Sequence, residues 1–186
     1  MPIAIGQPLE SDFHHPLGML SDCHRRIAGF LEALITVAEE ARGGELNSEQ
    51  REVLDGSLKY FREAPPKHTA DEEDSLFPRV RTRAGSSGKR FALLTVLQSD
   101  HLAAVQRHSA VDELGRRWLC AGPLSDQEAQ SLIDLLHGLR EMYQEHIEIE
   151  ETRLFPFAAN ILTPLDLHEI GKEMAHRRGL LPVGIG

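Results

Sequence analysis

Apolar residues recur three or four positions apart along most of this chain, which is the spacing of one face of an α-helix. Only 5% of the residues are aromatic, and no β-branched runs predict strands. The pattern therefore predicts an all-α protein. The predicted helices cover approximately residues 16–42, 47–82, 89–119 and 126–160, followed by a short helix from 163 to about 177.

The breaks between these segments carry residues that end or begin helices. The first segment stops at Gly43-Gly44, and a loop at 85–88 follows the second. Pro65-Pro66 is expected to kink or interrupt the second segment, and Ser125 with Glu128 forms a capping box for the fourth. Short loops between long helices favour an up-down-up-down four-helix bundle with a short extra C-terminal helix. The expected parts are an N-terminal extension (1–15), the bundle (16–162) and a C-terminal short helix and tail (163–186).

An eleven-residue pattern occurs twice. Residues 68–78 read HTADEEDSLFP, and residues 146–156 read HIEIEETRLFP. His, two adjacent Glu, Leu, Phe and Pro fall at the same offsets in both copies. A His followed four residues later by a Glu places an imidazole and a carboxylate together on one helix face. Each copy can therefore bind one side of a cation.

Two further histidines occupy apolar positions of the other two long segments. His24 lies between Leu20 and Ile27 on the apolar stripe of the first segment, and His101 lies on the stripe of the third. Counted from the three connecting loops, the four histidines reach one height in the bundle to within about 3 Å. The candidate metal ligands are His24, His68, Glu72, His101, His146 and Glu150.

Two carboxylates in the centre of an apolar bundle are costly unless protons or cations neutralise them. No Lys or Arg lies on the interior stripes at the height of Glu72 and Glu150. A pair of metal ions would neutralise both groups. Imidazole and carboxylate ligands suit iron or manganese, and zinc is a less natural choice for so carboxylate-rich a site.

This set of residues resembles the hemerythrin family, in its bacterial branch of HHE cation-binding domains. The resemblance covers nearly the whole chain, and the repeated His-x-x-x-Glu-Glu-x-x-Leu-Phe-Pro is its most specific element. It implies a four-helix bundle around two iron ions joined by an oxo or hydroxo group and by bridging carboxylates. Ferritin-like di-iron proteins use Glu-x-x-His, the reverse order, which neither copy shows.

The chain departs from the oxygen-carrying members of that family at two positions. They have a second His four residues after the ligand of the third helix, where this chain has Val105. Their fourth helix carries His-x4-Asp, where this chain has His146 and Glu150. The missing imidazole argues against reversible oxygen carriage. It leaves one iron with an open or water-filled position that suits redox chemistry or the sensing of iron.

Four further residues are candidates for a supporting role around the ligands. Glu73 and Glu151 turn about 100° from the ligand face, and we expect them either in solvent or orienting a ligating histidine. Tyr143, one turn from His146, either hydrogen-bonds a ligand or a bound oxygen species or simply packs in the core. His108 lies about 10 Å along the axis from His101, too far to bind the same ions, and is expected to be a core or supporting histidine.

Composition excludes several other classes. The chain has 186 residues, enough for one domain, and 29 acidic against 20 basic residues give a net charge of −9, which argues against nucleic acid or anionic membrane as partners. The two cysteines show no zinc spacing and suit a reducing compartment. The N-terminus lacks the pattern of a signal peptide, and no stretch has the length of a membrane span. We therefore expect a cytoplasmic protein.

Three functions are compatible with these observations. The first is a di-iron protein that handles or senses dioxygen, peroxide, nitric oxide or iron. The second is a peroxidase-like or catalase-like enzyme that scavenges peroxide. The third is a regulatory protein that responds to iron by changing its fold or its protein partner. A small diatomic molecule or peroxide is the expected ligand in the first two.

Overall fold

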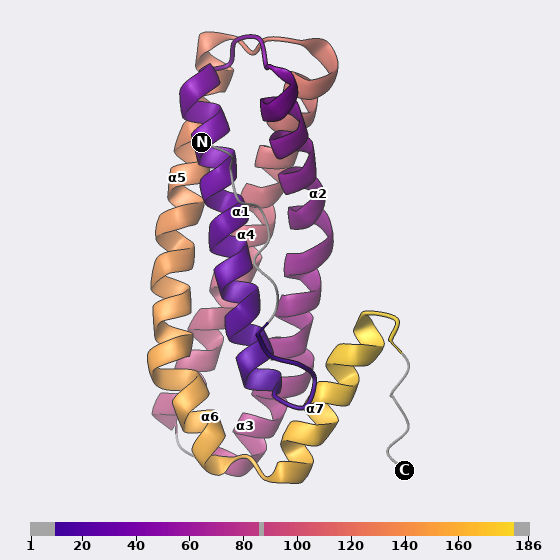
Figure 1. Ribbon diagram of the computed structural model, residues 1–186. Coiled ribbons are helices and arrows are strands. Elements are labelled where there is room, and N and C mark those ends of the chain that lie inside the picture. Colours follow the sequence, from indigo (N-terminus) through magenta and orange to yellow (C-terminus); the bar gives the residue numbers. More distant parts are fainter. Residues whose placement is uncertain (1–9, 86–87, 181–186) are drawn as a thin grey trace.

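Helices make up the fold, as a computed structural model shows for residues 10–85 and 88–180 (Figure 1). The described residues contain no strand, and the prediction of an all-α protein is confirmed. Residues 1–9, 86–87 and 181–186, which include most of the N-terminal extension and the end of the C-terminal tail, lie outside the described part. The elements are α1 (Pro16–Ala41), α2 (Ser48–Ala70), the π-helical segment η1 (Asp71–Leu76), α3 (Phe77–Ala84), α4 (Gly88–Ala121), α5 (Asp126–Ile149), the π-helical segment η2 (Glu150–Leu154), α6 (Phe155–Ile161) and α7 (Pro164–Arg177).

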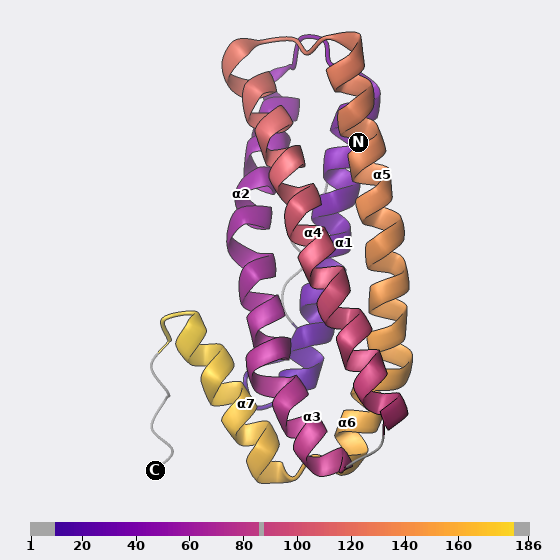
Figure 2. The same cartoon turned by 180° about the vertical axis from the view of Figure 1, so that it is seen from behind.

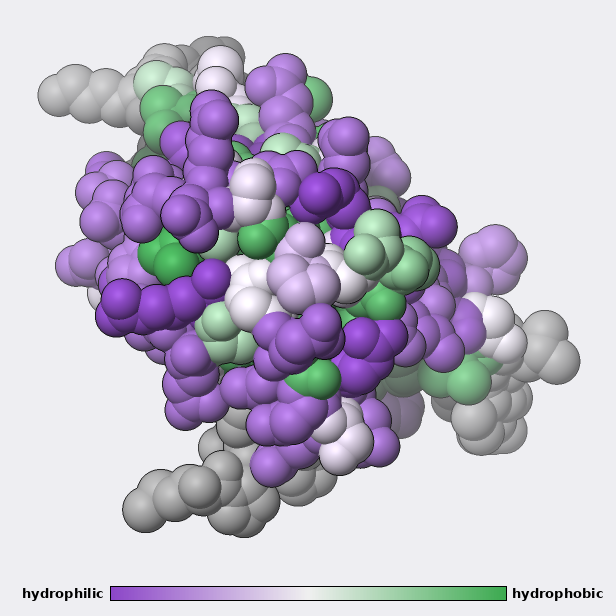
Figure 3. All heavy atoms as spheres, turned by 90° about the horizontal axis from the view of Figure 1, so that it is seen from above, coloured by the Kyte–Doolittle hydropathy of each residue, from purple (hydrophilic) through white to green (hydrophobic). Residues whose placement is uncertain are grey.

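Four helices pack side by side as a bundle. α1 contacts α2 and α5, and α4 contacts the same two helices from the other side, so the four enclose a common core. The α1–α2 and α4–α5 connections lie at the same end of the bundle (Figures 1 and 2). Seen from that end, the surface is mainly hydrophilic, with apolar residues in separate patches (Figure 3). Among the described helices, none combines the length and apolar character needed to cross a membrane.

The helix starts follow the capping signals in the sequence. The Asn47 side chain accepts a hydrogen bond from the backbone of Gln50 at the start of α2, and Gln50 reaches back to Asn47. Ser125 and Glu128 form the same reciprocal pair at the start of α5, where the sequence predicted it. These bonds satisfy backbone N–H groups that have no partner within the helix.

A layer of buried polar side chains divides the core into two apolar clusters. This polar layer contains His24, His68, Glu72, His101, His146 and Glu150. On α1, Leu20 belongs to the cluster at the α7 end of the bundle and Ile27 to the other cluster, with His24 between them. On α4, Leu97 and Val111 fall on the two sides of His101 in the same way. Tight apolar packing above and below therefore holds the polar layer in place.

The prolines within α2 do not interrupt it. The helix continues from Ser48 to Ala70 with Pro65 and Pro66 inside, so the interruption that the sequence offered as one alternative does not occur. Proline fixes φ near −65°, a helical value, and its cost lies in the missing N–H and a clash with the preceding turn. Phe61 and His68 are buried on the two sides of the prolines. We attribute the continuity of the helix to this packing.

Each copy of the repeated motif contains a π-helical segment, which the sequence did not predict. Phe77 donates its backbone N–H to the carbonyl of Glu72, and Phe155 donates to Glu150, five residues back in both cases. An α-helix would make these bonds four residues back. Inserted π-turns often occur at functional sites, and here they contain both candidate carboxylate ligands.

α7 packs against η1 and α1. Asp71, which is fully buried, accepts hydrogen bonds from Arg177 Nη1 at 2.9 Å and from Arg178 Nη2 at 2.7 Å. Arg177 also donates to Ser75 Oγ at 2.8 Å. The sequence pattern indicated no role for this end of α7. The structure shows that it is ion-paired with the residue preceding Glu72.

Candidate metal centre

Six buried side chains meet at the polar layer. They come from all four helices of the bundle, and each π-helical segment supplies one carboxylate. One group consists of His24, His68, Glu72 and Glu150, and the other of Glu72, His101, His146 and Glu150; within each, the nitrogen and oxygen atoms lie within 4.8 Å of one another. The structure thus brings together all six residues selected from the sequence, with both carboxylates shared by the two groups.

The two oxygens of Glu72 face different histidines. Oε1 lies 3.4 Å from His68 Nε2 and 3.8 Å from His24 Nε2, whereas Oε2 lies 3.2 Å from His101 Nε2. A carboxylate oriented in this way can bridge two cations.

Glu150 occupies the equivalent position in the second copy of the motif. Its Oε2 lies 3.1 Å from His24 Nε2 and 3.3 Å from His146 Nε2. Glu150 therefore also faces histidines of both groups, but through a single oxygen, whereas Glu72 uses both of its oxygens.

The spacing of these atoms fits a coordination shell. With metal–ligand bonds of about 2.1 Å, neighbouring ligand atoms are about 3.0 Å apart in an octahedron and about 3.4 Å apart in a tetrahedron. Most of the distances above fall in or near that interval, as does the 3.1 Å between the Nε2 atoms of His101 and His146.

The carboxylates also lack hydrogen-bond partners. Both oxygens of Glu72, both oxygens of Glu150 and Nε2 of His24 are buried without a hydrogen bond, although nitrogen and oxygen atoms lie nearby. Close approach without hydrogen-bond geometry indicates atoms that point at a common centre. Buried carboxylates are costly unless paired with cations, so these residues fit a bound metal ion.

The electrostatics of the layer are those of a cation-binding site. Burial lowers the pKa of His24, but the facing carboxylates of Glu150, Glu151 and Glu72 outweigh it and raise that pKa well above its ordinary value. Burial also lowers the pKa of His101, but the facing carboxylate of Glu72 outweighs this effect and raises that pKa to about 9. In the absence of metal, protons on these imidazoles therefore balance the carboxylates, and metal binding must displace them.

Residues 15–158 match the family model described as the hemerythrin HHE cation-binding domain. The chain belongs to this family. The matched part of this HHE domain runs from the residue before α1 into α6 and contains all six clustered residues. No individual curated protein matches the sequence. Family membership implies that the domain binds metal cations, and the two His/Glu groups are where it could hold them.

Three of the four histidines of the polar layer are oriented by a second carboxylate. Nδ1 of His101 lies 2.7 Å from Glu73 Oε1, and Nδ1 of His24 lies 2.8 Å from Glu151 Oε1. The second Glu of each motif, which the sequence left as either solvated or supporting, thus hydrogen-bonds a histidine on another helix. Such bonds set which ring nitrogen carries the proton and leave Nε2 facing the centre.

The partner of His146 was missed in the sequence. Nδ1 of His146 lies 3.3 Å from Asp100 Oδ2. Glu151, the partner of His24, also accepts a hydrogen bond from Ser21 Oγ at 2.9 Å. The only available signal for Asp100 was its place directly before His101, because the contact joins α4 and α5. His68 differs from the other three histidines, since its Nδ1 is buried without a hydrogen-bond partner.

Tyr143 and His108 bond to each other. The Tyr143 hydroxyl lies 2.7 Å from His108 Nε2, and the His108 ring stacks on Phe61 with centroids 4.7 Å apart. The structure shows the Tyr143 hydroxyl paired with His108 and not with one of the six candidate ligands. His108 is half-buried and is separate from the two His/Glu groups.

Burial of His108 predicts a dependence of stability on pH. Burial lowers the pKa of His108 from 6.5 to about 4. Below pH 6.5 the unfolded chain gains a proton that the folded chain does not, so stability falls as the pH drops toward 4. We expect the metal-free wild type to lose about 3 kcal/mol more than His108→Gln between pH 7 and pH 4, measured by urea unfolding. Replacement of the exposed His14 by Gln is the control, and parallel curves for wild type and His108→Gln would contradict the prediction.

Two cavities approach the polar layer of the HHE domain. A cavity of about 490 Å³ between α1 and α5 includes His24 and Glu151 in its wall. A cavity of about 470 Å³ between α2 and α4 includes His101 and the His108–Tyr143 pair. Val105, where oxygen carriers have a further histidine, lines this second cavity and is 65% exposed. The other lining residues include Leu58, Phe61 and Ala104.

Proposed function

We propose that this HHE domain binds two iron ions in the polar layer and handles or senses dioxygen, peroxide, nitric oxide or iron through them. One ion would be held by His24 and His68, the other by His101 and His146, with Glu72 and Glu150 bridging. The observation that carries the proposal is the pair of shared, buried carboxylates without hydrogen-bond partners. The bundle that holds them would extend over residues 16–162 in up-down-up-down order.

The donor set favours iron or manganese. Each group offers two imidazole nitrogens and carboxylate oxygens, and no cysteine is among them. Such mixed nitrogen and oxygen ligands are typical of iron and manganese, whereas thiolate-rich closed sites are typical of structural zinc. Four donors for each ion also leave positions of an octahedral shell available to a small ligand.

The chain's own residues would keep the site ordered and accessible. Glu73, Glu151 and Asp100 accept from Nδ1 of three histidines and so aim Nε2 at the centre. The cavity between α2 and α4 has a mainly apolar lining, which suits dioxygen or nitric oxide better than a charged molecule. The bound metal pair would supply the electrons and the Lewis acidity for reaction with the ligand.

The contact of α7 supports a second candidate, an iron-responsive regulatory protein. Asp71, which two arginines bind at the end of α7, directly precedes Glu72 in η1. Metal binding at Glu72 and docking of α7 therefore involve the same turn of helix. A change in metal occupancy could be transmitted to α7 and to a protein that binds it.

The test is anaerobic loading of the metal-free chain with Fe(II), followed by metal analysis and an optical spectrum before and after exposure to air. We expect two equivalents of iron and a new absorption band in air. His101→Ala should lose the band, whereas the control His137→Ala, outside the polar layer and paired with Glu39, should keep it. Binding of fewer than two equivalents by the wild type would reject the proposal. Turnover of hydrogen peroxide would identify a scavenging enzyme, and iron-dependent stability without turnover would favour the regulator.

A further inference from the structure

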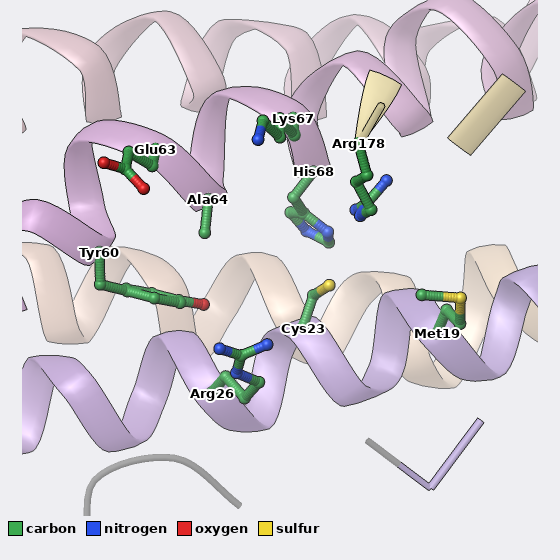
Figure 4. A pocket seen from close by; sticks show the side chains of 9 residues that line it. All are labelled: Met19, Cys23, Arg26, Tyr60, Glu63, Ala64, Lys67, His68 and Arg178. Carbon is green, nitrogen blue, oxygen red and sulfur yellow. The ribbon is translucent and has the colours of Figure 1, made fainter. Parts of the chain in front are cut away.

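We propose that the cavity between α1, α2 and the end of α7 binds a small oxyanion or carboxylate. This anion would hydrogen-bond Nδ1 of His68, the ring nitrogen that faces away from the centre of the polar layer. The cavity has a volume of about 240 Å³ and lies outside the two cavities described above (Figure 4). Its wall includes three basic side chains and one acidic one. They are Arg26, Lys67, Arg178 and Glu63.

His68 is the observation that points to a ligand. Its side chain is 7% exposed, and its Nδ1 is buried without a hydrogen-bond partner. Figure 4 shows the ring extending from α2 toward Cys23 of α1, with Arg178 beside it. The other three histidines of the layer each have a carboxylate at Nδ1. Only His68 lacks one, and its free side faces this cavity.

The basic side chains provide the charge that an anion requires. Among the described residues, neither Arg26 nor Lys67 forms an ion pair, and Nε of Arg26 is buried without a hydrogen bond. Arg178 already binds Asp71 at 2.7 Å, so it contributes less. Arg26 and Lys67 together outweigh Glu63, and the balance of the wall is positive.

The polar atoms that face the cavity are mainly donors. When Nε2 of His68 binds a metal ion, Nδ1 carries the ring proton and becomes a donor, a step that rests on the proposed function. Guanidinium and ammonium groups also donate and never accept. Several donors in the wall of one cavity match a group with two or more acceptor oxygens, and charge strengthens these hydrogen bonds. The bound anion would then orient His68 as Glu73, Glu151 and Asp100 orient the other imidazoles.

The test is calorimetric titration of the full chain, metal-free and iron-loaded, with inorganic phosphate and separately with acetate, at constant ionic strength. We expect one equivalent to bind, and preference between the two probes shows whether the site suits a tetrahedral or a planar anion. Arg26→Gln and Lys67→Gln should each weaken binding at least tenfold. Lys59→Gln, an exposed lysine of the same helix outside the cavity wall, should leave it unchanged.

A second readout follows His68 itself. The ¹⁵N resonance of its Nδ1 should shift on addition of the anion, and the shift should be absent in Arg26→Gln. No binding of either probe, or equal weakening by Lys59→Gln and Lys67→Gln, would overturn the proposal and leave a water molecule or general screening as the explanation. Anion binding by a chain that binds no iron would reject the metal centre alone. Iron binding without anion binding would reject this site alone.

Discussion

Glu72→Gln is expected to abolish binding of both metal ions, whereas Glu73→Gln is expected to lower metal affinity by only about 10- to 100-fold. Glu72 faces His24 and His68 with one oxygen and His101 with the other, so its loss removes a donor from both groups. Glu73 only accepts a hydrogen bond from Nδ1 of His101. The measurement is metal content after loading and dialysis, together with a titration of affinity.

Two neighbouring residues of one π-helical segment thus provide a matched pair of variants with the same substitution. The same contrast is expected between Glu150→Gln and Glu151→Gln, because Glu151 lies at Nδ1 of His24. Circular dichroism of each variant controls for folding, and Gln preserves the size of the side chain. Equal losses of metal in Glu72→Gln and Glu73→Gln would show that the proposed division between ligand and supporting residue is wrong.

Removal of the metal with a chelator is expected to lower Tm by about 15 °C or more. A metal present at a thousand times its Kd stabilises the folded state by about 4 kcal/mol per site. For a chain of this size, 1 kcal/mol corresponds to roughly 2–4 °C in Tm. The loss is large because without metal the six buried groups balance one another only through protons on the imidazoles.

The control for this effect is the double variant that combines Glu72→Gln and Glu150→Gln. It should melt at the same temperature with and without chelator, because neither ion binds. Readdition of Fe(II) to the wild type should restore the original Tm, and zinc should restore it less. A wild-type Tm that does not respond to the chelator would mean that metal binding contributes little to folding, and would count against the proposed centre.

The polar layer shows how far the sequence could predict the site. The repeat indicated His68, Glu72, His146 and Glu150, and the apolar stripes indicated His24 and His101. These predictions depended only on the helical period and on the rise per residue, which are nearly constant in any helix. Helix length and loop position therefore set the height of each residue before packing is known.

The contacts across helices were beyond such reasoning. The hydrogen bond between Asp100 and Nδ1 of His146 joins residues 46 positions apart. The two arginines at the end of α7 bind Asp71, which lies 106 and 107 positions before them. The hydrogen bonds of Glu73 and Glu151 to histidines of other helices are of the same kind. Nothing in a local pattern distinguishes a solvated Glu from one that contacts a neighbouring helix.

Gly171 is a further example of a contact that depends on tertiary structure. A Cβ at this position of α7 would lie 1.9 Å from the backbone oxygen of Phe13, so only glycine permits α7 to approach the segment before α1. In the sequence it is a glycine inside a helix, which local propensity counts only as a small cost. Its role comes from a neighbour more than 150 residues away.

By itself, the sequence determined the helices, their capping residues and the six metal-capable side chains at one height, because these follow from local periodicity and the geometry of the helix. The tertiary structure decided which oxygen faces which imidazole and where the π-turns fall, and it left His68, among the four histidines of the polar layer, without a partner at Nδ1. These features depend on side chains from different helices meeting in space, and on the energy of satisfying their buried polar atoms together.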